Sequence, residues 1–177
     1  MAERVGAGLG RPVVSIDQAI VDRVGMSIAE LFDTKGEAAF RRLETEVLQE
    51  TLDAKPNVII DGGGGLVVAD ENRQAIRARG TTVWLDAPNS VLLERIGSFA
   101  SRPLLDASPT EALARLRRDR LGFYTTAADI IVDTTNRSEP EVAETVVEEL
   151  EQLKQRDGNS PWLTETVQLA DLSLIHI

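Results

Sequence analysis

The chain has 177 residues, 42% of them apolar, which is enough for one globular domain with a buried core. Its net charge of −10 argues against nucleic acid and anionic membrane surfaces as partners, because both attract basic proteins. It has no Cys and a single His, His176, which excludes disulfides, thiolate metal sites and Ser-His-Asp catalysis. Without a membrane-length apolar run or a signal-peptide core at its start, we expect a cytoplasmic protein.

Strand and helix signals alternate along the chain. In chain order they predict a strand at 12–16; helices at 17–25, 27–36 and 37–54; a strand at 57–61; a helix at 70–80; a strand at 81–86; helices at 89–97 and 109–128; a strand at 129–134; and a helix at 139–156. The strands are near-continuous apolar runs, as expected where both faces are buried. The alternation predicts a three-layer α/β/α fold around a parallel sheet.

Residues 157–177 do not continue this pattern. A stretch rich in Gly, Asn, Ser and Pro at 158–161 indicates a linker. The last six residues, "LSLIHI", match one reading frame of a common sequencing-library transposon end, so we interpret them as a scar. We therefore predict one domain over 1–156, followed by a linker and non-native tail, or by the start of a truncated second domain, over 157–177.

The segment "VIIDGGGGLV" at 58–67 runs from a strand directly into four glycines. Residues without Cβ atoms let backbone amides approach a ligand closely. No Lys follows the run, and the first basic residue is Arg73, so this is not a phosphate loop of the G-x-x-x-x-G-K type. A tight strand-to-helix turn is the alternative, but it does not need four glycines.

Several motifs, in this order and spacing, resemble the shikimate kinase family. They are "LGRPVVSID" (9–17), "GMSIAELF" (25–32), "FRRLE" (40–44), "GGGG" (62–65), "RPLL" (102–105), Arg120-x-x-x-Tyr124 followed by "AD" (128–129), and "VDT" (132–134) followed by "NR" (136–137). The resemblance covers about residues 2–154. It implies a P-loop kinase fold and a monomeric enzyme that uses ATP and Mg²⁺ to phosphorylate the 3-hydroxyl of shikimate, in chorismate and aromatic amino-acid biosynthesis.

The resemblance also implies a substrate site. Two guanidinium groups would clamp the substrate carboxylate, since their fork matches carboxylate geometry. Asp17 would bind the hydroxyls and accept the proton of the attacking one, and the glycine loop would contact the ring. Glu44, three residues after Arg41, can orient that Arg by an i,i+3 pair and would also lie near the substrate. The residues implied are Asp17, Arg41, Glu44, Gly62, Gly63, Gly64 and Arg120. The alternatives are that the two Arg are solvated helix residues, as we expect for Arg42, and that Asp17 is a helix N-cap.

On the nucleotide side, the resemblance makes 95–105 a lid. Arg102 on this lid would neutralise charge on the transferring phosphate and exclude water, with Arg95 assisting, and Arg137 would stack on adenine. Ser15 and Asp61 would hold Mg²⁺ through water. An ordinary surface role is the alternative for Arg102.

The sequence departs from the family in one large respect. It contains no G-x-x-x-x-G-K-[ST] motif, and "GAGLG" at 6–10 is not followed by Lys. Met1 aligns within the helix that follows the family's P-loop, so we expect the central strand and the phosphate cradle to be missing and the chain to be poorly stable. Ser15 replaces the Asp usual in the family.

Two interpretations follow from the missing motif: an N-terminally truncated kinase with weak or no activity, or a P-loop-less relative that binds shikimate without catalysis. Another small-molecule P-loop kinase, such as one for gluconate, shares the fold without needing this carboxylate clamp. A dinucleotide-binding enzyme is excluded because no G-x-G-x-x-G follows a strand.

Overall fold

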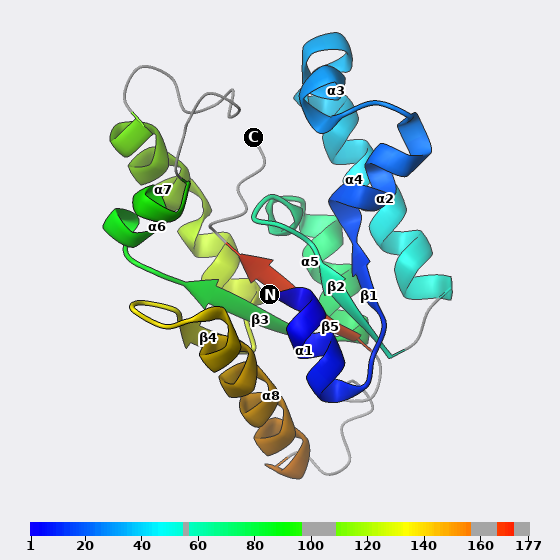
Figure 1. The fold of residues 1–177 in the computed structure, drawn as a ribbon. Helices are drawn as coiled ribbons and strands as arrows, with labels where there is room; N and C mark the ends of the chain where they lie inside the picture. Colours follow the sequence, from blue (N-terminus) through cyan, green and yellow to red (C-terminus); the bar gives the residue numbers. More distant parts are fainter. Residues whose placement is uncertain (55–56, 97–108, 157–165, 172–177) are drawn as a thin grey trace.

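The fold is built around one parallel sheet. The structure, a computed structural model, describes residues 1–54, 57–96, 109–156 and 166–171 (Figure 1). The strands are β1 (Val13–Ser15), β2 (Val58–Asp61), β3 (Thr81–Asp86), β4 (Ile130–Asp133) and β5 (Thr166–Asp171). They lie in the order β1-β2-β5-β3-β4, and every neighbouring pair is parallel. The predicted parallel sheet is therefore confirmed.

Helices cover both faces of this sheet. They are α1 (Ala2–Leu9), α2 (Ile16–Val24), α3 (Ile28–Lys35), α4 (Glu37–Ala54), α5 (Asp70–Arg79), α6 (Asn89–Ile96), α7 (Pro109–Ala127) and α8 (Glu139–Arg156), with a short 3₁₀ helix, η1 (Leu66–Val68). The seven predicted helices are all present, within two residues at each end. The start of α3 carries a complete capping box between Ser27 and Glu30.

Alternate residues of each strand face opposite layers, as the pleat requires. Ile59 and Val83 belong to a buried cluster with α1 and α8, which pack side by side on one face (Figure 1). Ile60 belongs to the cluster with α2–α5, and Trp84 to a third cluster with α6 and α7. The predicted three-layer α/β/α architecture is confirmed.

The strand β5 lies at the centre of the sheet, between β2 and β3 (Figure 1). The sheet therefore has a central strand, and residues 166–171 form it; the strand expected to be missing, the one before the family's P-loop, is a different segment, and that expectation stays a prediction. The sequence "TVQLAD" at 166–171 is short and fits a loop as well as a strand, so its local signal is weak. Its place depends on pairing with strands that lie about a hundred residues earlier in sequence, and local patterns do not report such pairing. The division into domains at residue 156 stays a prediction.

The N-terminal helix α1 approaches β1 closely through a glycine. A Cβ added to Gly6 would lie 2.5 Å from Cγ2 of Val13 and 2.9 Å from the carbonyl oxygen of Arg11. Gly10 then ends the helix in the left-handed conformation, with φ of 64°. The "GAGLG" segment thus has a packing role, which explains glycine in a helix interior.

We predict that Gly6→Ala destabilises the protein by about 1–3 kcal/mol, because the new methyl group overlaps backbone and core atoms. Gly122→Ala is the matched control. It lies within α7 with no atom within 4 Å of its added Cβ, and it should stabilise by about 0.5–1 kcal/mol through helix propensity. Urea unfolding of both variants measures the difference, and equal effects would refute the packing role of Gly6.

Candidate active site

The carboxyl ends of the parallel strands meet at one edge of the sheet, where open α/β folds bind ligands. Ser15 and Asp61 end β1 and β2 and are register partners. Asp86 and Asp133 end β3 and β4 and are register partners as well. Most of the described residues predicted for substrate, nucleotide or metal lie at this edge or on the helices beside it.

The first of these helices, α2, begins directly after β1. Its N-cap is Ser15, whose hydroxyl accepts the backbone N–H of Gln18 at 3.3 Å. The N-cap interpretation of Asp17 is therefore wrong. Asp17 lies in the first turn of α2, half-buried, and its carboxylate acts electrostatically on Glu44. This position at the carboxyl edge suits a group that binds substrate hydroxyls.

Arg41 on α4 is held between two carboxylates. Its Nη1 donates to Glu44 at 2.6 Å, and its Nε and Nη2 donate to Glu37 at 3.2 and 3.0 Å. The side chain is 18% exposed, whereas Arg42 is exposed. The solvated-residue interpretation thus fits Arg42 and not Arg41.

Arg120 on α7 approaches the glycine loop from the opposite side. It is 6% exposed, and its Nη1 lies 3.4 Å from the carbonyl oxygen of Gly64. The hydroxyl of Tyr124, one turn further along α7, donates to the same oxygen. The solvated interpretation of Arg120 is wrong, because the side chain is buried against this loop.

The glycine loop fits beneath the two guanidinium groups. Gly62, Gly63 and Gly64 are buried, and Gly63 has a φ of 58°, which favours glycine. A Cβ added to Gly65 would lie 2.1 Å from Nη1 of Arg41. The structure thus adds Gly65 and Tyr124 to the predicted site. The fourth glycine of the run and the Arg-x-x-x-Tyr motif were the signals for them.

Glu44 is the most deeply buried carboxylate of the site, at 3% exposure. Burial raises its pKa to about 7; Arg41 and Arg120 oppose this rise, and Asp17 adds to it. Glu44 therefore changes charge close to neutral pH, while bonded to a guanidinium predicted to hold the substrate.

Two of the three predicted nucleotide residues meet at the loop after β4. Arg95 donates to the hydroxyl of Thr134 at 2.7 Å and to its carbonyl oxygen at 2.6 Å. The backbone N–H of Arg137 donates to the same carbonyl oxygen at 3.3 Å, and its side chain bonds to Glu141 and Thr145. Arg102 lies outside the described residues.

The predicted metal ligands, Ser15 and Asp61, are adjacent on neighbouring strands. Within the described ranges, no group of three or more His, Cys, Asp or Glu residues is arranged to hold a metal ion. Mg²⁺ in kinases takes one or two carboxylates and completes its shell with water and phosphate oxygens. Asp61, with Ser15 beside it, fits such a water-mediated site, although the Ser15 hydroxyl already serves as a cap.

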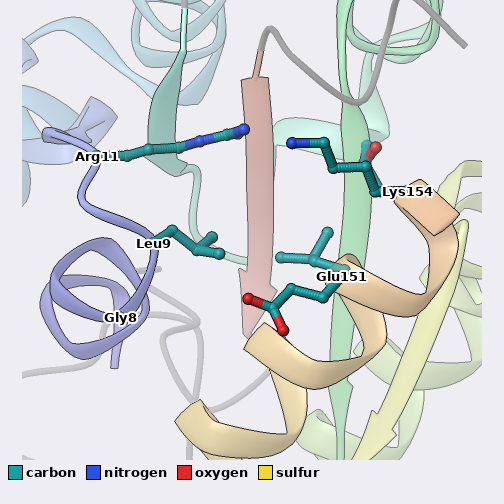
Figure 2. Close-up of a pocket in the computed structure, with 7 residues that line it drawn as sticks. Gly8, Leu9, Arg11, Glu151 and Lys154 are labelled. Carbon is teal, nitrogen blue, oxygen red and sulfur yellow. The ribbon is translucent and has the colours of Figure 1, made fainter. Parts of the chain in front are cut away.

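A separate pocket of about 210 Å³ lies near the opposite edge of the sheet (Figure 2). Thr81, which begins β3, lines it together with Arg11, Leu150, Glu151 and Lys154. Figure 2 shows Arg11 and Lys154 pointing toward one another across the central strand. This pocket is not the predicted substrate site, because it is lined by the amino end of β3 and none of the predicted substrate residues lines it.

The protein has a three-layer fold, with guanidinium groups at the carboxyl edge of a parallel sheet. This arrangement, together with the matching solved structures, places it in the P-loop kinase fold class. A model of one family within this class, described as shikimate kinase, matches residues 1–151. The chain belongs to the shikimate kinase family. Members of this family are phosphotransferases that phosphorylate shikimate with ATP. The family predicted from the sequence is therefore confirmed.

Individual relatives agree with this assignment. The shikimate kinase of Dehalococcoides mccartyi is 37% identical over 150 residues, which cover 85% of each chain. That of Halorhodospira halophila is 40% identical over 144 residues, which cover 81% of each. The solved shikimate kinase from Acinetobacter baumannii, in complex with shikimate, matches with a TM-score of 0.78 at 28% identity, over 90% of this chain and 87% of that one. In the part of the chain that the structure describes, no helix is suited to crossing a membrane.

We predict that Glu44 makes stability depend on pH. Its folded pKa of about 7 lies above the ordinary value, so between about pH 4.5 and 7 the folded state binds more protons than the unfolded state. The stability from Glu44 is therefore fully present below about pH 4.5 and is lost as pH rises through 7, by on the order of 3 kcal/mol.

Urea unfolding of wild type and Glu44→Gln at several pH values between 5 and 8 measures this contribution. The stability of wild type relative to the variant should fall as pH rises. Glu46→Gln, an exposed position on the same helix, is the control and should follow wild type. Parallel pH profiles for wild type and Glu44→Gln would contradict the assignment.

Proposed function

We propose that this chain binds shikimate at the carboxyl edge of the sheet, as the acceptor for phosphate from ATP. The observation that carries the proposal is the convergence of Arg41, from α4, and Arg120, from α7, on Gly64–Gly65. Two nearby guanidinium groups over a loop without side chains suit a small ring with one carboxylate. The solved relative from Acinetobacter baumannii is a complex with shikimate, which supports the same ligand here.

Within this proposal, each side chain has a defined task. Arg41 and Arg120 bind the carboxylate and orient the ring. The glycine loop, 62–64, lies against the ring, and Asp17 accepts hydrogen bonds from hydroxyls and takes the proton of the attacking 3-hydroxyl. Glu44 orients Arg41 through its 2.6 Å ion pair.

The nucleotide residues are proposed on the same basis. Arg95 and Arg137 meet at Thr134 on the carboxyl edge and would contact ATP, and Arg102 would neutralise charge on the phosphate being transferred. Asp61 and Ser15 would hold Mg²⁺ through water. Bound Mg²⁺ supplies charge neutralisation to the phosphates.

We further propose that the domain predicted over 1–156, with β5 paired into its sheet, works as a monomer. We place it in the cytoplasm, where ATP is available; the absence of Cys fits a reducing compartment.

A non-catalytic shikimate-binding protein is the second candidate. The printed sequence has no G-x-x-x-x-G-K-[ST] motif, which in P-loop kinases cradles the phosphates. We therefore expect this exact chain to bind shikimate and to transfer phosphate weakly or not at all. A coupled ADP-release assay with ATP, Mg²⁺ and shikimate tests this expectation, and turnover at an ordinary kinase rate would contradict it.

Isothermal titration calorimetry with shikimate tests the site itself, with gluconate as the comparison acid. Shikimate should bind and gluconate should not. Arg41→Lys keeps the charge but loses the fork, so it should weaken binding by about tenfold or more. The matched control is Arg42→Lys, one residue further and exposed, which should bind as wild type does. Equal effects of the two variants, or tighter binding of gluconate, would refute the proposed site.

We predict that Gly65→Ala weakens shikimate binding with little loss of stability. The added methyl group would meet the flexible end of Arg41, which can move aside at small cost to the fold. The displaced guanidinium then no longer matches the substrate carboxylate. Calorimetry and urea unfolding of the same variant separate the two effects, and unchanged affinity would show that Arg41 need not lie over the loop.

A further inference from the structure

We propose that Glu44 takes up a proton when shikimate binds, and that this uptake makes the affinity of the site fall as pH rises through neutrality. This inference rests on the proposed function, because it concerns the same site and the same carboxylate clamp. It gives Glu44 a role in binding beyond holding Arg41 in place.

The first argument is the balance of charge around Glu44. The charged groups that face it are Arg41 on its own helix, Asp17 from α2 and Arg120 from α7. Arg41 is also bonded to Glu37. Among these described residues, two positive groups meet three negative ones before any ligand is bound. A substrate carboxylate adds a fourth negative charge to a site already short of positive charge.

The second argument is competition for Arg41. Nε and Nη2 of Arg41 donate to Glu37, and its Nη1 donates to Glu44 at 2.6 Å. A substrate carboxylate that takes donors from this guanidinium weakens its bond to Glu44. A buried carboxylate that loses part of its partner, while another negative charge arrives, favours its neutral form.

The third argument identifies Glu44 as the group that takes the proton. Its side chain is 4% exposed, whereas that of Glu37 is 51% exposed and is screened by water. Asp17 is only half-buried. The pKa of Glu44, already raised to about 7 by burial, needs only a modest further rise to bind a proton at physiological pH.

Calorimetric titration of the full chain with shikimate at pH 7.5, in HEPES and in Tris, measures the uptake directly, with MES and acetate as the pair of buffers at pH 5.5. These buffers differ in ionisation enthalpy, so the observed heat differs between them in proportion to the protons taken up. We expect roughly half a proton per shikimate at pH 7.5 and almost none at pH 5.5, where Glu44 is already neutral. The dissociation constant should rise between pH 6 and 8, by about threefold per pH unit near pH 7.5.

Glu44→Gln is the decisive variant. It should bind shikimate with the same heat in both buffers, while the exposed control Glu46→Gln should retain the wild-type difference. Glu44→Gln removes only this carboxylate, so proton uptake by any other group of the chain would persist in it. If the variant does not fold, wild-type heats at pH 7.5 that do not depend on the buffer still overturn the inference.

The outcomes separate this inference from the proposed function. Binding of shikimate with heats that do not depend on the buffer would overturn the proton uptake and leave the substrate site intact. Uptake that persists in folded Glu44→Gln would overturn the assignment to Glu44. If shikimate does not bind at all, the proposed function and this inference both fall.

Discussion

The buried ion pair between Arg41 and Glu44 holds the substrate side of this protein together. The Glu44 side chain is 4% exposed and its carboxylate lies 2.6 Å from the guanidinium, so the two groups are paired largely away from water. A carboxylate buried this deeply is costly unless it is paired. Because the two residues are three apart on α4, helix geometry alone brings them together. The guanidinium is therefore in place before a ligand arrives, which lowers the ordering cost of binding.

The fixed guanidinium constrains the loop after β2. Arg41 occupies the space where a side chain at position 65 would lie, so glycine there lets the guanidinium keep this position. The carbonyl oxygen of Gly64 is held by Arg120 and Tyr124, and Tyr124 stacks on Trp84 of β3 with ring centroids 5.4 Å apart. The loop is thus fixed to α4 on one side and to α7 and the sheet on the other. These neighbours, and not the glycines themselves, set the position of the loop.

The sequence predicts the elements with local signals and misses those set by distant contacts. Helix α4 and the Arg41–Glu44 spacing follow from periodicity and were predicted. Ser15 and Asp17 are both residues that favour the N-cap position, and Ser15 is the one that caps α2. The choice depends on whether the helix begins one or two residues earlier, and helix propensity does not locate a helix start that closely.

Two further features depend on tertiary contacts. The need for Gly65 depends on where Arg41 lies in space, which motif spacing does not report. The strand β5 has a weak local pattern, and its central place comes from pairing with β2 and β3.

The central strand β5 also helps to separate substrate binding from phosphate transfer in this fold. The strand β5 pairs with the backbone N–H and C=O groups that β2 and β3 present to each other across the gap between them. Any extended segment that runs parallel to these strands can form the same backbone hydrogen bonds. The proposed substrate residues, by contrast, lie on α2, α4, α7 and the glycine loop, and the hydrogen bonds of Arg41, Arg120 and Tyr124 described above join residues of α4, α7 and this loop. Phosphate transfer needs a cradle of backbone amides that the substrate side does not supply. On the proposed assignment, substrate binding and phosphate transfer are therefore separable properties of this fold, and the first rests mainly on the contacts around Arg41.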